Sequence, residues 1–151
     1  MYRALFRWKQ GERRIFLDAL RRLLEGKAEI LFAYVHGSFV EGRPFHDVDL
    51  AVYLDSGKID EEDMDGFALT LAMELERSLP ALLKGIAQPY PPLDIRALNR
   101  APLGFGYQAC RGQLLCSRDE AVRTQWVERT VSCYLDLRPL QHQSLKEAMT
   151  E

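Results

Sequence analysis

The chain has 151 residues, of which 47% are hydrophobic, and its formal net charge at pH 7 is −2. This length supplies one hydrophobic core and leaves too little chain for two ordinary domains, so we expect a single domain over residues 1–151. The slightly acidic balance excludes proteins that bind duplex nucleic acid through a strongly basic surface, and we expect no direct binding to nucleic acid.

The periodicity of the apolar residues predicts the secondary structure. Apolar residues recur every three or four positions in the expected helices and alternate with polar residues, or form short continuous runs, in the expected strands. In chain order, the expected elements are a helix over 12–25, a strand over 29–36, a loop over 37–46, a strand over 47–54, a helix over 61–79, an irregular proline-rich run over 88–92, a strand over 93–98, a short helix over 102–109, a strand over 113–117 and a C-terminal helix over about 119–137 with a short tail.

Two of these ends carry a specific signal. Gly26 follows the first helix as a stop, and Pro139 is expected to end the last one. Helices and strands in this order predict an α/β or α+β domain with a small mixed sheet flanked by helices.

Cysteine usage and hydropathy indicate the compartment. Cys110, Cys116 and Cys133 form no C-x-x-C pair, so neither a disulfide framework nor a zinc site is expected. No stretch has the length and apolar character of a membrane span, and no long apolar run follows the charged N-terminus. We therefore expect a soluble, cytoplasmic protein without a membrane partner.

Three aspartates are candidate metal ligands. Asp47 and Asp49 lie one residue apart on the strand over 47–54, so they project from the same face of the sheet. Asp94 lies on the strand over 93–98 and faces the pair if the two strands are neighbours. Such a group of hard oxygen ligands suits Mg²⁺ shared with a triphosphate, and three carboxylates would complete a two-metal site.

A Gly-Ser pair precedes the first two aspartates. Gly37 lets the backbone turn sharply and approach a phosphate, and the Ser38 hydroxyl can donate to a phosphate oxygen. Arg43 in the following loop and Arg96 beside Asp94 match phosphate oxygens, although a surface ion pair is the simpler explanation of either arginine alone.

This order of residues resembles the minimal nucleotidyltransferases of the DNA polymerase β-like superfamily. The resemblance covers Gly37, Ser38, Asp47, Asp49 and Asp94. It implies a nucleotidyltransferase fold, ATP as substrate and two Mg²⁺ ions held by the three aspartates, which then act as the catalytic residues. One departure is the loop between Ser38 and Asp47, which has eight residues and is shorter than is usual in the family.

Three further segments resemble one branch of that family, the adenylyltransferase antitoxins of HEPN-domain RNase toxins. They are LDIRALNRAP at 93–102, RGQLLCSRDE at 111–120 and WVERTVSCYLDLRPL at 126–140. The resemblance implies a HEPN-domain toxin as partner and the transfer of AMP from ATP to a tyrosine of that toxin.

Two other functions stay open. A binding-only antitoxin would neutralise its toxin by covering it, and the short loop is compatible with that alternative. A nucleotidyltransferase acting on a small hydroxylated molecule is the other, although related enzymes of that kind carry an additional helical domain for which this chain has little room.

Several other residues are interpreted as structural. His36 and His46 flank the loop, but no carboxylate is spaced to orient either histidine as in a catalytic triad. The aromatic residues Trp8, Trp126 and Tyr134 are interpreted as core residues rather than as surfaces for base stacking.

Overall fold

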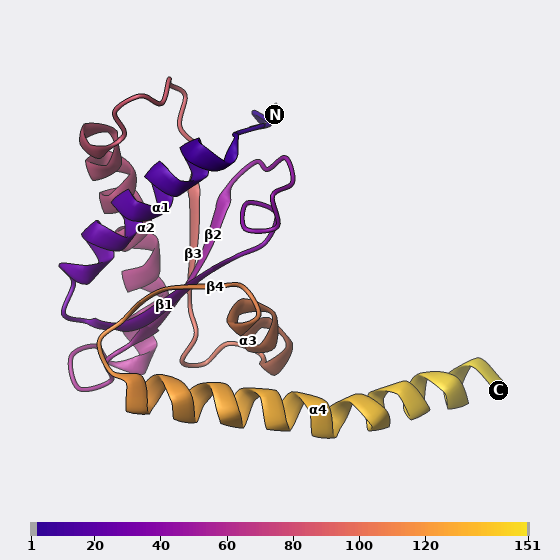
Figure 1. Cartoon of the computed structure of the whole chain (residues 1–151). Coiled ribbons are helices and arrows are strands. Elements are labelled where there is room, and N and C mark those ends of the chain that lie inside the picture. Colours follow the sequence, from indigo (N-terminus) through magenta and orange to yellow (C-terminus); the bar gives the residue numbers. More distant parts are fainter. Residues whose placement is uncertain (1–2, 151) are drawn as a thin grey trace.

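The computed structural model describes residues 3–150, with side chains described for residues 3–137. In it the chain forms one mixed sheet flanked by helices (Figure 1). The strands are β1 Ile30–His36, β2 Val48–Leu54, β3 Leu93–Ala97 and β4 Gln113–Ser117. The helices are α1 Gln10–Glu25, α2 Met64–Ser78, α3 Leu103–Cys110 and α4 Glu120–Thr150, with the short 3₁₀ segments η1 Glu61–Asp63 and η2 Leu79–Leu82 on either side of α2.

The strand order in the sheet is β3-β2-β1-β4. β1 pairs with β2 and with β4 in antiparallel fashion, whereas β2 and β3 are parallel. A parallel pair cannot be joined by a tight hairpin, and here the connection passes through α2, which packs beside β3. This crossover brings residues 48–52 alongside residues 93–97.

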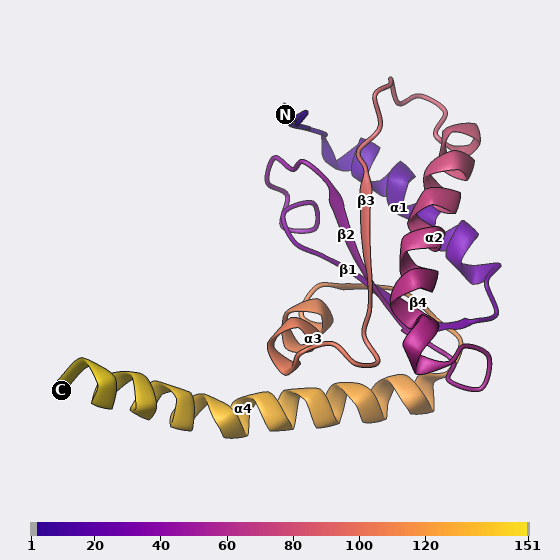
Figure 2. The same ribbon diagram turned by 180° about the vertical axis from the view of Figure 1, so that it is seen from behind.

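Each face of the sheet has its own hydrophobic cluster. On one face, α1 and α2 cover the alternate residues Val48, Leu50, Val52 and Leu54 of β2 (Figure 2). On the other face, Trp126 of α4 and residues of α3 pack with Phe32, Tyr34 and Ala51. Because side chains alternate across a strand, the odd-numbered positions of β2, including Asp49, point to the side of the sheet on which α3 lies.

The fold class is confirmed as α+β, and every expected helix and strand is present, within a few residues of its expected bounds except at the C-terminal end of the last helix. The helix over 61–79 divides into η1, α2 and the start of η2. Pro80 lies in η2 and has no N–H to donate, so the regular α-helix ends before it, at Ser78.

The expected end of the last helix is wrong. α4 continues through Pro139 to Thr150, so no separate tail begins after residue 137. A proline in a helix removes one hydrogen bond and crowds the preceding turn, which is a local cost. The following residues 141–149 are rich in Gln, Leu, Lys, Glu, Ala and Met, which favour helix and carry it onward. Both views show the C-terminal part of α4 extending away from the sheet (Figures 1 and 2).

None of the helices in the described part of the chain combines the length and apolar character needed to span a bilayer.

The turn that leads into β4 requires glycine at position 112, because a side chain there would collide with β1. A Cβ added at Gly112 would lie 2.2 Å from the carbonyl oxygen of Val35 and 3.0 Å from Cβ of His36. We expect Gly112→Ala to lower the free energy of unfolding by about 2–4 kcal/mol, because β4 can no longer pair closely with β1. Urea unfolding followed by circular dichroism measures this loss.

Gly104 in α3 is the matched control, since no atom lies within 4 Å of the position its Cβ would occupy. Gly104→Ala should raise the free energy of unfolding by about 0.5–1 kcal/mol through helix propensity. Equal effects of the two substitutions would contradict the role of close packing at Gly112.

Candidate functional site

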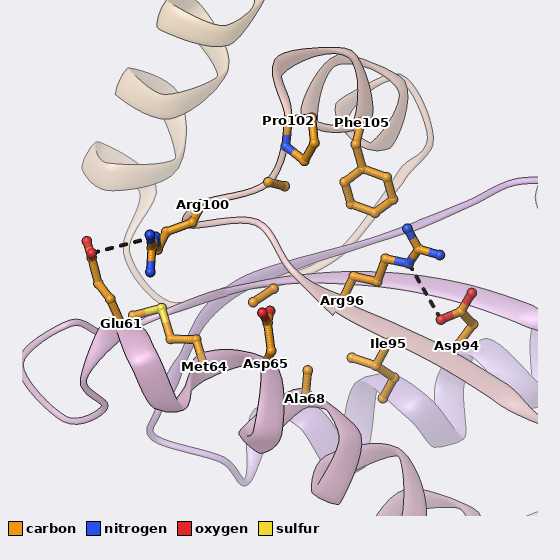
Figure 3. A pocket seen from close by; sticks show the side chains of 12 residues that line it. Glu61, Met64, Asp65, Ala68, Asp94, Ile95, Arg96, Arg100, Pro102 and Phe105 are labelled. Atoms are coloured by element: carbon orange, nitrogen blue, oxygen red, sulfur yellow. Dashed lines mark ion pairs between the residues drawn. The ribbon is translucent and has the colours of Figure 1, made fainter.

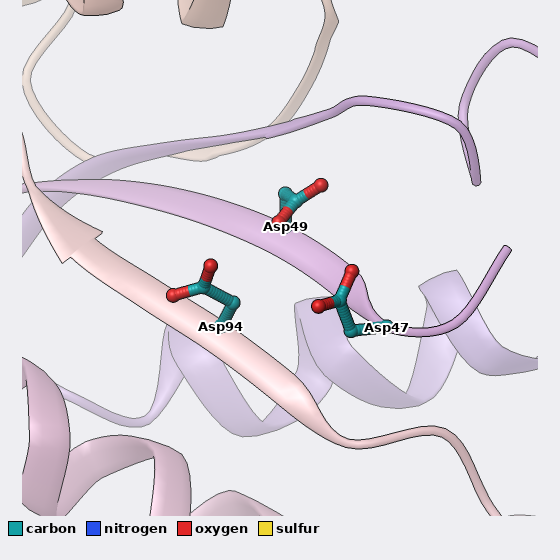
Figure 4. A group of neighbouring side chains, drawn as sticks. All are labelled: Asp47, Asp49 and Asp94. Carbon is teal, nitrogen blue, oxygen red and sulfur yellow. The ribbon is translucent and has the colours of Figure 1, made fainter. Parts of the chain in front are cut away.

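Three carboxylates meet on neighbouring strands (Figure 4). In the parallel register of β2 and β3, Asp49 lies directly opposite Asp94, and Asp47 precedes the first residue of β2. Each of the three side chains offers a carboxylate oxygen, and these atoms lie within 4.8 Å of one another. The structure therefore brings together the three aspartates that the sequence analysis predicts as metal ligands.

The central carboxylate is electrostatically unfavourable in its ionised form. The pKa of Asp49 is raised from an ordinary 3.8 to about 6. Burial is the largest cause, and the charges of Asp47 and Asp94 act in the same direction, against a smaller opposing effect of Arg96 and Arg3. Desolvation and like charge both disfavour the anion. A cation placed among the three oxygens would relieve both.

Two arginines partly balance this charge. Arg3 donates a hydrogen bond of 2.8 Å from its guanidinium to the carboxylate of Asp47. Arg96 lies 3.8 Å from Asp94, with both side chains largely exposed. Neither arginine pairs with Asp49, which stays the least compensated of the three carboxylates.

The donor set fits a hard divalent cation. Mg²⁺ takes oxygen ligands, is held in proteins by one or two carboxylates, and completes its shell with waters and substrate phosphates. The group of Asp47, Asp49 and Asp94 is partly exposed, so it leaves room for such ligands. A second acidic group, Asp60, Glu62 and Asp63, is fully on the surface.

Gly37 stands against the carboxylate of Asp49. Its φ of +82° is a conformation that residues with a side chain rarely adopt, and an added Cβ would lie 2.4 Å from Asp49 Oδ2. The following residues form a compact turn, in which the backbone N–H groups of Glu41 and Arg43 donate to the carbonyls of Gly37 and Ser38. Gly37 therefore lies against the central carboxylate of the group, and the role of Ser38 in nucleotide binding remains a prediction.

Arg13 of α1 anchors this loop through its guanidinium, a role that no sequence pattern indicates. Its guanidinium donates to the carbonyls of Phe39 at 2.6 Å, Arg43 at 3.0 Å and Trp8 at 3.0 Å. It also lies over the rings of Phe39 and Phe45, 5.4 and 4.8 Å from their centroids. One side chain thus fixes the two halves of the loop relative to α1. Among seven basic residues in 1–22, only the three-dimensional contacts identify Arg13.

Arg43 forms an ion pair with Glu41 in the same loop, and its side chain is largely exposed. Its role as a nucleotide-binding residue remains a prediction.

His36, which the sequence analysis set aside, lies next to the carboxylates. It is the register partner of Asp49 across β1 and β2, and its ring meets the edge of Phe105 with 5.4 Å between centroids. Burial lowers the pKa of His36; the charge of Asp94 opposes this effect and that of Arg96 adds to it. Its neutral ring can approach the carboxylate site without adding a charge. His46 instead contacts the backbone carbonyl of Ala4 through Nδ1 at 2.9 Å.

The aromatic residues Trp8, Trp126 and Tyr134 have structural contacts. Trp8 packs edge-on against Phe16 and Trp126 is buried against the sheet, while Tyr134 stacks on Tyr107 at 3.9 Å. Their interpretation as packing residues agrees with these contacts.

Comparison with known proteins adds a family match. The family described as "Polymerase beta, Nucleotidyltransferase" matches residues 18–121, which is well over half of the chain. A search among curated proteins finds no match.

Solved structures share the fold. One chain of the complex of tri-AMPylated Shewanella oneidensis HEPN toxin with MNT antitoxin superposes with a TM-score of 0.61 at 17% identity, over 91% of this chain and 98% of that chain. A toxin–antitoxin complex with AMP-PNP gives 0.60 at 18% identity, again over 91% and 98%. The toxin–antitoxin pair MntA–HepT gives 0.57 at 17% identity, over 93% and 99%.

The contact between Gly37 and Asp49 can be tested with a pair of glycines. Gly37 and Gly42 have similar positive φ angles of 82° and 77°, but no atom lies within 4 Å of a Cβ at Gly42. Both substitutions to alanine carry the same backbone strain, and only Gly37→Ala displaces the Asp49 carboxylate. We expect Gly37→Ala to lower nucleotide transfer by about 100-fold and Gly42→Ala by less than about tenfold. Similar losses in steady-state assays of both variants would contradict this role of Gly37.

The charge of Asp49 should have a measurable cost. Because folding raises its pKa from 3.8 to about 6, its ionisation destabilises the folded state, and the free energy of unfolding falls as pH rises through that interval. In EDTA at pH 7.5, we expect Asp49→Asn to be more stable than the wild type by about 1–2 kcal/mol. The difference should shrink near pH 4 and on addition of Mg²⁺. Urea unfolding at the two pH values measures it, and a difference that grows toward low pH would contradict the assignment.

Proposed function

This chain belongs to the polymerase beta nucleotidyltransferase family, and from that membership we propose that it is an antitoxin that transfers AMP from ATP to a tyrosine of a HEPN-domain RNase toxin. One observation carries the enzymatic part of the proposal. The carboxylate oxygens of Asp47, Asp49 and Asp94 converge within 4.8 Å, and the backbone of Gly37 packs against the central one, Asp49, where a side chain would displace it.

We assign metal binding to the three aspartates. Asp47 and Asp49 would hold Mg²⁺ at the triphosphate, and Asp94 would join them in holding a second ion on the side of the acceptor. Mg²⁺ bound there would neutralise charge on the phosphates and on the attacking oxygen. Two ions suit three carboxylates better than one, because a single ion takes only one or two of them.

The remaining steps fall to residues of the chain. The Ser38 hydroxyl and the backbone N–H groups of the turn would donate to phosphate oxygens and orient the α-phosphate. The tyrosine oxygen then attacks the α-phosphorus, a new O–P bond forms, and the bond from that phosphorus to the oxygen bridging to the β-phosphate breaks. Pyrophosphate leaves with the bond electrons, and the carboxylate of Asp94 takes the tyrosine proton.

The identity of the acceptor is supported by structures with the same fold. One of these complexes contains a tri-AMPylated HEPN toxin with an MNT antitoxin, and another is a toxin–antitoxin with AMP-PNP. Segments 93–102, 111–120 and 126–140 of this chain add the resemblance to the antitoxin branch. We assign the protein to the cytoplasm because its proposed substrate, ATP, is available there, and the free state of Cys110, Cys116 and Cys133 agrees with a reducing compartment.

Label transfer tests the proposal directly. The purified chain is incubated with Mg²⁺, ATP labelled in the α-phosphate and a candidate HEPN-domain partner protein. We expect AMP on a tyrosine of that protein, located by mass spectrometry, and a loss of at least about 10³-fold in Asp47→Ala plus Asp49→Ala. Removal of Mg²⁺ with EDTA should have the same effect on the wild type.

Other outcomes separate the alternatives. Neutralisation of the toxin by both the wild type and the double variant, without label on any protein, would contradict the enzyme and support a binding-only antitoxin. Label that appears on an added small hydroxylated molecule and not on protein would contradict the protein acceptor.

A further inference from the structure

A groove of about 650 Å³ runs beside the third carboxylate (Figure 3). β3 forms its floor, η1 and the start of α2 form one wall, and the segment leading into α3 forms the other. β3 is the edge strand of the sheet, so this side of it is open. The lining side chains that the following argument uses are Glu61, Asp65, Asp94, Arg96, Arg100 and Phe105.

The groove lies on the opposite side of the carboxylates from the Gly37–Ser38 turn. The turn comes directly after β1 in the chain, whereas the groove runs along β3. The strand order β3-β2-β1 places β2, with Asp49, between the turn and the groove. A smaller cavity of about 180 Å³ is lined by Asp49, Asp94, Arg96 and Phe105, three of which also line the groove. A molecule in the groove therefore has access to the carboxylates from the side opposite the Gly37–Ser38 turn.

The inner end of the groove suits an aromatic ring. Phe105 is only partly buried, the guanidinium of Arg96 lies 5.4 Å from the centroid of its ring, and Pro102 stands next to it (Figure 3). The ring of His36 meets Phe105 from the side of the carboxylates. An aryl group placed against Phe105 and Arg96 would gain apolar and cation–π contact. Asp94 lines the same groove and lies 3.8 Å from Arg96, so a hydroxyl on that ring would lie near the carboxylate.

The outer end of the groove is acidic. Glu61 and Asp65 line it, and Arg100, its nearest cation, pairs with Glu61 at a distance of 3.8 Å. Asp60, Glu62 and Asp63 lie on the surface immediately beside this end. A negative field of this kind favours a basic partner segment, and proteins that bind RNA present basic surfaces to their ligand.

We propose that this groove is the acceptor subsite, which takes an exposed partner segment carrying the target tyrosine, with its ring against Phe105 and its flanking basic side chains against Glu61 and Asp65. This inference rests on the proposed function and deepens it. ATP and the acceptor then approach the three aspartates from opposite sides, and the acidic rim selects the partner by charge.

Charge reversal at the rim tests the subsite. The complete chain carrying Glu61→Lys plus Asp65→Lys is compared with wild type in the labelled-ATP assay, at several concentrations of the HEPN-domain protein. Both positions are exposed, so the fold should be kept. We expect KM for the HEPN-domain protein to rise by about tenfold or more and its dependence on salt to weaken, while the affinity for AMP-PNP stays within about twofold.

The control is Glu25→Lys plus Glu128→Lys, which changes the net charge equally at two exposed positions outside the groove. It should leave KM for the HEPN-domain protein within about twofold of wild type. A second variant, Phe105→Ala, should also raise this KM without changing the affinity for AMP-PNP, and its circular dichroism shows whether α3 is kept.

The outcomes are distinguishable. Weakened AMP-PNP binding in the rim variant or in Phe105→Ala would make the groove part of the nucleotide site and overturn the proposal. An unchanged KM for the HEPN-domain protein, or an equal rise in the control, would also overturn it while leaving the transfer activity established. A wild type that never labels the HEPN-domain protein contradicts the proposed function itself, and the acceptor subsite falls with it.

Discussion

The parallel pairing of β2 with β3 forces Asp49 and Asp94 to face each other across one strand spacing, and the neighbourhood of the site is arranged around the resulting repulsion. The position nearest the Asp49 carboxylate is a glycine with no Cβ to displace it. The register partner of Asp49 is His36, and burial lowers the pKa of this histidine. The other two carboxylates, Asp47 and Asp94, are paired with Arg3 and Arg96. Burial together with this concentration of like charge raises the pKa of Asp49 to about 6, and such a perturbed carboxylate is typical of a functional site.

The loop beside these carboxylates is short, yet it is anchored to the body of the domain. Arg13 donates to three backbone carbonyls and covers two aromatic rings, and Phe6 and Phe45 exchange backbone hydrogen bonds at the far end of the loop. Phe39 and Phe45 are almost completely buried in the same cluster. A phosphate-binding turn fixed in this way would contribute its donors without first losing conformational entropy.

The sequence predicted most of the fold and the centre of the site because both depend on local patterns. Alternation placed Asp47, Asp49 and Asp94 on strands, and a glycine before a loop located the turn at Gly37. Contacts between distant segments carried no such pattern. Arg3 reaches Asp47 across 44 residues, and Arg13 reaches Arg43 across 30. Nothing in the spacing of the basic residues distinguishes these two from their neighbours.

The other departures have equally physical origins. The end of α4 was misplaced because the propensity of Pro139 to stop a helix was weighed without the strong helix formers that follow it. The sequence predicts a structural role for His36 because no carboxylate is spaced to orient it as in a catalytic triad, whereas antiparallel pairing places it opposite Asp49. The groove along β3 is lined by residues from 61 to 105, which only the crossover through α2 brings together.

That same crossover couples ligand binding to folding. The carboxylates come from two segments whose alignment requires α2 to be docked and β3 to be paired, so an unfolded or partly folded chain has no binding site. A ligand that binds only the assembled site stabilises the folded protein in proportion to the logarithm of its concentration above the dissociation constant. Proteases act on opened chains, so saturation of this site would also slow degradation. The geometry that places three carboxylates together would thus make the lifetime of the protein depend on the supply of the ligand that binds them.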